Sequence, residues 1–175
     1  CRIYNKTFKT LTSSKKASTA MSHPHMPTVT DFSAVFSEAY ASHKTPAGLV
    51  ENLMPDVSKT SWLLITSNSL VGATESTTLT MVLERAITHG VAIALDVAWQ
   101  PNSWGLEPGS KPPPEVLRRF HPLAQEATLI HCTQEEADEF FSSHDPLAIH
   151  SSLSQLPGVA ITDIDGSVRW CIGGR

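Results

Sequence analysis

The sequence predicts an α/β fold with a largely parallel sheet. Short apolar segments of strand length alternate with longer segments in which apolar residues recur every three or four positions. The segment 91–97 is apolar up to Asp96, which is typical of a strand that is buried on both faces. Only the last two strand-like segments are joined by a tight turn, at Asp165-Gly166, so we expect a single hairpin there.

Length and composition are those of one globular domain. The chain has 175 residues, of which 41% are hydrophobic and 17% charged. A net charge of -4 gives no reason to expect a nucleic-acid partner, and no apolar run is long enough for a membrane helix. Cys1, Cys132 and Cys171 lie far apart, so a reducing compartment is expected, and we predict a cytoplasmic protein.

Residues 1–30 differ from the rest of the chain. They are basic, rich in Ser and Thr, and contain no acid before Asp31. We expect a weakly structured leader followed by a domain over 31–175. The alternative is an organelle transit peptide, for a plastid or a mitochondrion, because such peptides share this composition. Since the first residue is Cys, we also expect the chain to be a fragment.

The first half of the domain is expected to contain two helices around one strand. A short amphipathic helix is expected within 32–53, with its apolar residues between 32 and 40, and residues 43–48 are expected to form the loop after it. Residues 62–66 are expected to form a buried strand. A second helix is expected over 75–88, with Thr74 as its N-cap and Gly90 just beyond its end. Its apolar stripe is formed by Leu79, Val82, Leu83 and Ala86.

The second half continues the alternation after the strand at 91. A helix is expected from Glu115, kinked or ended by Pro122, then a strand over 127–132. Residues 133–141 form a helix that the sequence T-Q-E-E opens as a capping box. Asp145 caps a further helix with Ile149, Leu153 and Leu156 facing the core, before strands at 158–162 and 167–172.

Asp96 is the residue that the strand pattern itself singles out. Ligands of parallel sheets gather at the carboxyl ends of the strands, where Asp96 is expected to emerge. A carboxylate in that place needs a partner, which a cation, a hydroxyl group or a basic side chain could supply. The alternative is an Asp that caps the following turn. No metalloprotease, dinucleotide, P-loop or G-x-S-x-G motif is present to narrow the choice.

Four segments together resemble the ribokinase-like PfkB carbohydrate kinases, most closely the fructokinase-like branch. They are WLLITSNSLVGATES, LDVAWQPNSW, ATLIHCTQEEADEFF and GVAITDIDGSVRWCIGG, in the family's order. The resemblance covers about 55–175. It implies a ribokinase-like three-layer αβα sandwich with a largely parallel sheet, of which this chain is an incomplete, central part.

The resemblance also implies site residues. Asp96 corresponds to the Asp of the family's D-x-N-x-R-P segment and would lie at the phosphate or sugar side, together with Gln100 in place of the Arg. Ala98 stands in place of the Asn. Glu136 occupies the position of the Glu in N-x-x-E and would hold magnesium through water, although with Thr133 it could simply form the capping box.

On the nucleotide side, the resemblance implies Thr162 and Gly166, with Ile164 where a first glycine is expected. Here the alternative is a hairpin turn without a ligand. The implied ligands are ATP, Mg²⁺ and a sugar. No catalytic residue is expected in this chain, because the family's Gly-Ala-Gly-Asp segment, which bears the base, would follow Arg175.

The resemblance therefore implies a sugar kinase that transfers the γ-phosphoryl group of ATP to a sugar hydroxyl. The alternative is a non-catalytic relative with the same fold, which binds a sugar or nucleotide or serves as a structural subunit. Because strands from missing segments would leave a sheet edge unpaired, we also expect the chain to associate, as a homodimer.

Overall fold

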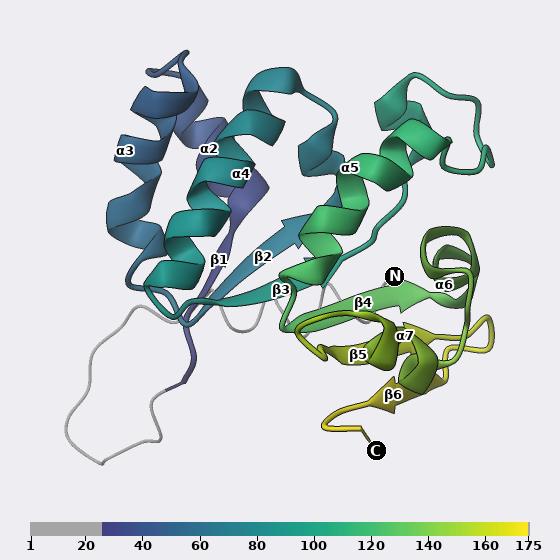
Figure 1. Ribbon diagram of the computed structural model, residues 1–175. Coiled ribbons are helices and arrows are strands. Elements are labelled where there is room, and N and C mark those ends of the chain that lie inside the picture. The colour runs from purple at the N-terminus through teal and green to yellow at the C-terminus, as the bar shows by residue number, and fades with distance from the viewer. Residues whose placement is uncertain (1–25, 175) are drawn as a thin grey trace.

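In the part of the chain that the structure describes, six strands form one sheet in the order in which they occur along the sequence (Figure 1). The computed structural model describes residues 26–174. The first five strands are parallel, and β6 runs antiparallel to β5, which confirms the α/β fold with a largely parallel sheet. The strands are β1 Val29–Asp31, β2 Trp62–Thr66, β3 Ala92–Asp96, β4 Leu129–Thr133, β5 Gly158–Thr162 and β6 Val168–Cys171.

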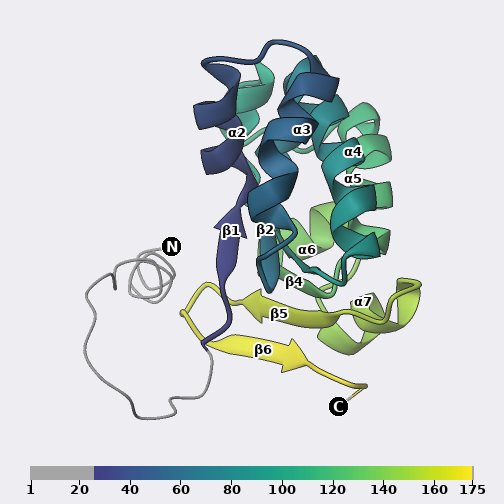
Figure 2. The ribbon, with the colours of Figure 1, turned by 90° about the vertical axis from the view of Figure 1, so that its left-hand side faces the viewer.

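The described helices lie on one face of this sheet, as Figures 1 and 2 agree. Crossovers between parallel strands are right-handed, and a strand order that follows the chain sends every crossover to the same side. The helices are α2 Phe32–Tyr40, α3 Pro46–Val57, α4 Ala73–Thr88, α5 Pro114–Gln125, α6 Gln134–Phe141 and α7 Pro146–Ser152. Two short 3-10 helices, η1 Ser67–Leu70 and η2 Pro101–Trp104, follow β2 and β3.

The core lies between these helices and the sheet face that they cover. Alternate strand residues point into it and are at most 1% exposed, among them Ile65, Leu95, Ile130 and Ile161. Burial of each such side chain contributes about 1.5–3 kcal/mol. Their neighbours along the strands point to what we call the second face, which is less buried and includes the cross-strand row Thr66, Asp96, His131, Ala160 and Trp170.

Most of the expected elements are confirmed, several to within a residue. The Asp145 carboxylate caps α7 by accepting a hydrogen bond from the Leu147 amide, and Thr133 and Glu136 form the capping box of α6. Gly90 follows α4 with φ of 76°. Such a left-handed backbone suits glycine, because a Cβ would be strained there.

Four details of the sequence-based expectation were wrong. β1 has only three residues, too few for a pattern, and α3 was missed because Pro46, Gly48 and Pro55 conceal its apolar face. Thr74 lies inside α4, whose N-cap is Gly72. Leu156 was expected in the core, but it is 57% exposed in a left-handed turn after α7.

The domain boundary expected at residue 31 falls at the end of β1, close to the start of the described residues. The leader expected over 1–30 lies mostly outside the described residues, and the boundary at 31 stays a prediction. None of the helices within 26–174 combines the length and hydropathy that crossing a bilayer requires.

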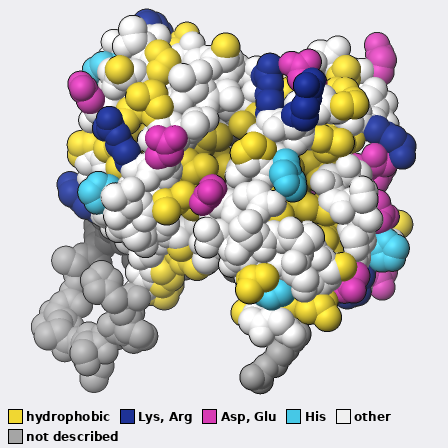
Figure 3. All heavy atoms as spheres, in the orientation of Figure 1, with side chains coloured by type: hydrophobic (Ala, Val, Ile, Leu, Met, Phe, Trp, Pro, Cys, Tyr) yellow, Lys and Arg dark blue, Asp and Glu magenta, His cyan; other side chains and the backbone are white. Residues whose placement is uncertain are grey.

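The outer surface of the helix layer carries an apolar groove between α4 and α5. Hydrophobic side chains gather between these helices in Figure 3, and the groove is lined mainly by Leu79, Leu83, Ile87, Pro122 and Leu123. The groove shares no lining residue with the pocket of the candidate site described below.

The edge strand β6 leads to a prediction about self-association. Among the strands of residues 26–174, none pairs with its outer side, and Val168, Trp170 and Ile172 are 52%, 61% and 59% exposed. Because apolar edge strands promote pairing between chains, the weight-average mass in sedimentation should rise with concentration. Trp170→Lys should shift this rise to about tenfold higher concentration.

The matched control for this prediction is Ile87→Lys, which changes an apolar residue that is 39% exposed on α4, away from the edge. It should leave the association unchanged. A parent chain that stays monomeric across the dilution series, or an equal effect of both substitutions, would contradict the assignment to β6.

Candidate functional site

Three polar side chains from neighbouring strands meet on the second face at the carboxyl ends of β3, β4 and β5. Asp96 pairs in register with His131, so both side chains point to the same side of the sheet. The Asp96 Oδ1 atom lies 2.9 Å from His131 Nδ1, and His131 Nε2 lies 3.0 Å from Thr162 Oγ1. The strand register therefore builds a continuous chain of hydrogen bonds across three strands.

The position of Asp96 agrees with the sequence-based expectation. It ends a central parallel strand, and its side chain is 21% exposed, so solvent reaches the carboxylate. Its partner is a basic side chain, His131, rather than the amides of the following turn. His131 was missed by the sequence analysis, although the alternation of Leu129, His131 and Thr133 with buried Ile130 and Cys132 is a signal that a polar residue faces Asp96.

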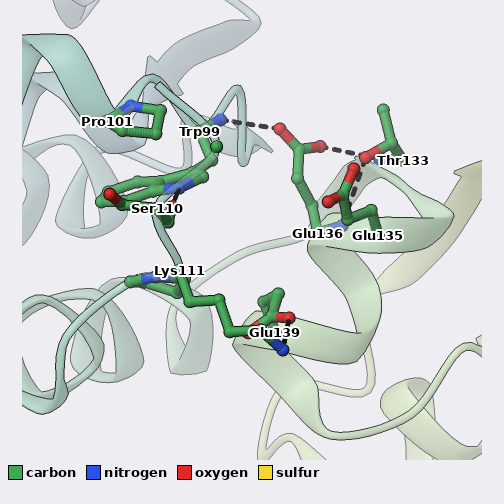
Figure 4. A pocket seen from close by; sticks show the side chains of 10 residues that line it. Trp99, Pro101, Ser110, Lys111, Thr133, Glu135, Glu136 and Glu139 are labelled. Atoms are coloured by element: carbon green, nitrogen blue, oxygen red, sulfur yellow. Dashed lines mark hydrogen bonds and ion pairs between the residues drawn. The ribbon is translucent and has the colours of Figure 1, made fainter. Parts of the chain in front are cut away.

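Glu136 lies near the same edge of the sheet, at the start of α6. Its Oε1 atom accepts a hydrogen bond from the Trp99 amide, and its Oε2 atom accepts one from the Thr133 amide, both at 2.7 Å (Figure 4). The Thr133 hydroxyl completes the capping box by accepting from the Glu136 amide. The carboxylate thus ties the loop after β3 to the N-terminus of α6.

A pocket of about 250 Å³ opens beside this carboxylate (Figure 4). One wall is the Trp99 ring, whose indole N–H donates to the Ser110 carbonyl at 2.8 Å. On the other side, Lys111 pairs with Glu139 at 2.6 Å, which raises the pKa of the Lys111 ammonium. Within residues 26–174, no group of three or more His, Cys, Asp or Glu side chains is arranged to hold a metal ion.

The two departures from the D-x-N-x-R-P pattern lie in the loop after β3. Ala98 has a φ of 43°, a left-handed conformation that costs a residue with a Cβ about 1–2 kcal/mol and that Asn tolerates better. The Gln100 side chain is exposed and accepts a hydrogen bond from the Ser103 hydroxyl at 3.4 Å. No contact joins Gln100 to Asp96 among the described hydrogen bonds.

The turn after Thr162 satisfies most of its own polar groups. The Gly166 amide donates to the Asp163 carbonyl at 3.0 Å, with a φ of 84° at the glycine, while Ile164 is 99% exposed. Arg169 donates two hydrogen bonds to Asp163, at 2.7 and 2.8 Å, and lowers the pKa of that carboxyl.

The second acid of this turn is Asp165. Hydrogen bonds from the Ser167 hydroxyl and amide lower the pKa of its carboxyl. Both acids therefore carry negative charge at neutral pH, one residue and three residues from Thr162.

A second polar cluster occupies the same end of the sheet near β1 and β2. The Ser33 hydroxyl lies 2.8 Å from that of Ser69 and donates to Glu75 at 3.5 Å. Partial burial raises the pKa of the Glu75 carboxyl, and the two serines oppose this by hydrogen bonding. This cluster holds α2, η1 and α4 together and has no residue in common with the Asp96 chain.

Comparison with known proteins identifies the fold. The sequence matches no protein-family model and no curated protein. The structure is similar to a PfkB protein from Polaromonas sp. JS666, with 18% identity over 74% of this chain and a TM-score of 0.58. It also resembles a fructokinase from Xylella fastidiosa, with 22% identity over 72% of this chain and a TM-score of 0.55.

A third similar structure is a fructokinase from Vibrio cholerae O395 with bound fructose, ADP and calcium, with 14% identity over 65% of this chain and a TM-score of 0.54. The chain spans 42%, 38% and 36% of these three proteins, in that order. Residues 26–174 therefore have a partial ribokinase-like fold, as the sequence resemblance implied.

The bonds of Glu136 lead to a stability prediction. Glu136→Ala removes two hydrogen bonds from backbone amides to a carboxylate and should lower the free energy of unfolding by about 1–3 kcal/mol. Glu136→Gln keeps one carbonyl acceptor and should have an intermediate effect. Chemical denaturation measures all three proteins.

Glu135→Ala provides the control, since Glu135 is the exposed neighbour in the same helical turn. It should change the free energy of unfolding by no more than about 0.5 kcal/mol. Equal losses for the two alanine variants would show that the bonds of Glu136 are not what stabilises this turn.

Proposed function

We propose that this chain carries the central part of the cleft of a sugar kinase, which transfers the γ-phosphoryl group of ATP to a sugar hydroxyl. The observation that carries the proposal is the convergence of Asp96, Glu136 and Thr162 at one edge of a ribokinase-like sheet. Ligands of open α/β sheets bind at the carboxyl ends of the strands, which is where these residues lie. Two of the similar solved structures are fructokinases, which favours this proposal over a non-catalytic relative.

Each residue has a proposed part. Asp96 faces the sugar or the transferred phosphoryl group, and Gln100 belongs to the same side as a neutral substitute for an Arg. Thr162 and Gly166 face the nucleotide. The segment from Asp96 to Thr162 would thus span the two ligands, which have to meet for direct transfer.

Glu136 is the proposed contact for magnesium, through water. Each of its oxygens accepts one backbone hydrogen bond and retains capacity for a second, so a hydrated cation fits the donor set. A lone carboxylate suits Mg²⁺, which keeps several of its waters in proteins. When bound with ATP, the ion neutralises charge on the phosphoryl oxygens.

Two features limit what this chain does by itself. Gln100 has no positive charge with which to hold a phosphoryl group. The sequence also contains no Gly-Ala-Gly-Asp segment, so the proposed base and the amides beside it are not supplied by these 175 residues.

The proposed location is the cytoplasm. Cys132 and Cys171 are both buried free thiols, which agrees with a reducing compartment.

The proposal is tested by calorimetric titration with ATP, magnesium and fructose. The chain should bind ATP weakly and more tightly with magnesium, because Glu136 contributes only in the presence of the ion. Asp96→Asn should weaken fructose binding by about threefold to tenfold, which is the effect of one hydrogen bond. Glu38→Gln, an exposed change on α2, is the control.

An enzyme assay completes the test. The rate of ADP formation in the presence of sugar should equal the rate in a no-sugar control, since the proposed base is not in this chain. Turnover well above that level would contradict the assignment of the base to another segment. Failure to bind either ATP or fructose would contradict the kinase proposal itself.

A further inference from the structure

The hydrogen bonds of the Asp96–His131–Thr162 chain have a defined direction. An ionised carboxylate can only accept, so Asp96 requires a proton on His131 Nδ1. A neutral imidazole with its proton on Nδ1 has a bare Nε2, which can only accept. The Thr162 hydroxyl must then donate its proton to Nε2.

This direction determines what the strand edge offers to a ligand. The Thr162 proton is used internally, so its oxygen has only lone pairs available. Asp96 Oδ2 is not used in the bond to His131 and is likewise an acceptor. The two ends of the Asp96–His131–Thr162 chain therefore both present acceptors to a ligand.

We propose that His131 makes this edge a site for ring hydroxyl groups, by fixing Asp96 and Thr162 as hydrogen-bond acceptors. The inference rests on the proposed function and refines it, because it assigns hydroxyl donors, of a sugar or of a nucleoside ribose, to these two residues. Phosphate oxygens do not suit these two residues, since they are acceptors themselves and neither Asp96 nor Thr162 has a proton to donate to them.

The surrounding charges agree with this assignment. Asp163 and Asp165 follow Thr162 in the turn, and the pKa of each carboxyl is lowered. Arg169, the positive side chain in contact with this turn, is already paired with Asp163 and donates to the His144 carbonyl as well. Phosphate groups placed beside this turn would therefore be repelled, whereas the hydroxyl groups of a sugar or of a nucleotide's ribose would not.

His131 is a positioning residue in this proposal, and its tautomer is the direct test. Nitrogen-15 NMR of the histidine rings at roughly pH 8, above the ordinary titration range of histidine, should show His131 with its proton on Nδ1. His150 is the internal reference, because its Nδ1 lies 2.8 Å from the Pro157 carbonyl, which can only accept. In Asp96→Asn the proton should redistribute toward Nε2, while the His150 signals stay unchanged.

The ligand class is tested by titrating the chain with adenosine, fructose and inorganic tripolyphosphate. Thr162→Val keeps the shape of the side chain and removes its oxygen. It should weaken binding of adenosine or of fructose by about threefold to tenfold. The ligand whose binding weakens shows whether Thr162 accepts from a nucleoside hydroxyl or from a sugar hydroxyl. Tripolyphosphate binding should not change, and Thr80→Val on the exposed side of α4 should change none of the three.

Three outcomes would overturn the inference. A His131 proton on Nε2, or a doubly protonated ring, would reverse the direction of the Thr162 hydrogen bond. Weaker tripolyphosphate binding in Thr162→Val would show that the Thr162 hydroxyl donates a hydrogen bond to phosphate. If the tautomer is as expected but neither hydroxyl ligand binds, the assignment of the ligand fails together with the proposed function, while the hydrogen-bond direction stands.

Discussion

The parallel register of β3, β4 and β5 is the constraint on which the candidate site depends. It places Asp96 opposite His131 and brings Thr162 within hydrogen-bonding distance of the same imidazole. Side chains alternate between the two faces of a sheet, so a slip of one residue would bury Asp96 among the core residues and expose Leu95. The burial that fixes the hydrophobic core therefore also fixes the geometry of the polar chain.

The placement of the helices depends on the same strand order. Many of the individual strands and helices could be predicted from the sequence. β2, β5 and the capping box of α6 were predicted because their apolar patterns and cap residues are local and strong. β1 and α3 were not, since three residues carry no period and prolines concealed the helix. The sequence also could not show that all described helices share one face, because this depends on strand order rather than on any segment.

The site was predictable in position but not in composition. Asp96 and Thr162 could be assigned to the carboxyl edge from the ends of their strands. His131 lies inside an apolar segment, and its role depends on pairing with a strand 35 residues away. The two bonds of Glu136 show a similar limit, since the capping box is local but the bond to the Trp99 amide joins distant segments.

The most direct test of the account is to locate ligand binding by chemical-shift mapping of backbone amides during titration with magnesium-ATP and fructose. The account predicts that the shifts concentrate at the carboxyl ends of β3, β4 and β5, around Asp96, His131 and Thr162. Shifts concentrated instead in the groove between α4 and α5, or at the amino ends of the strands, would contradict the assignment of this edge as the ligand site.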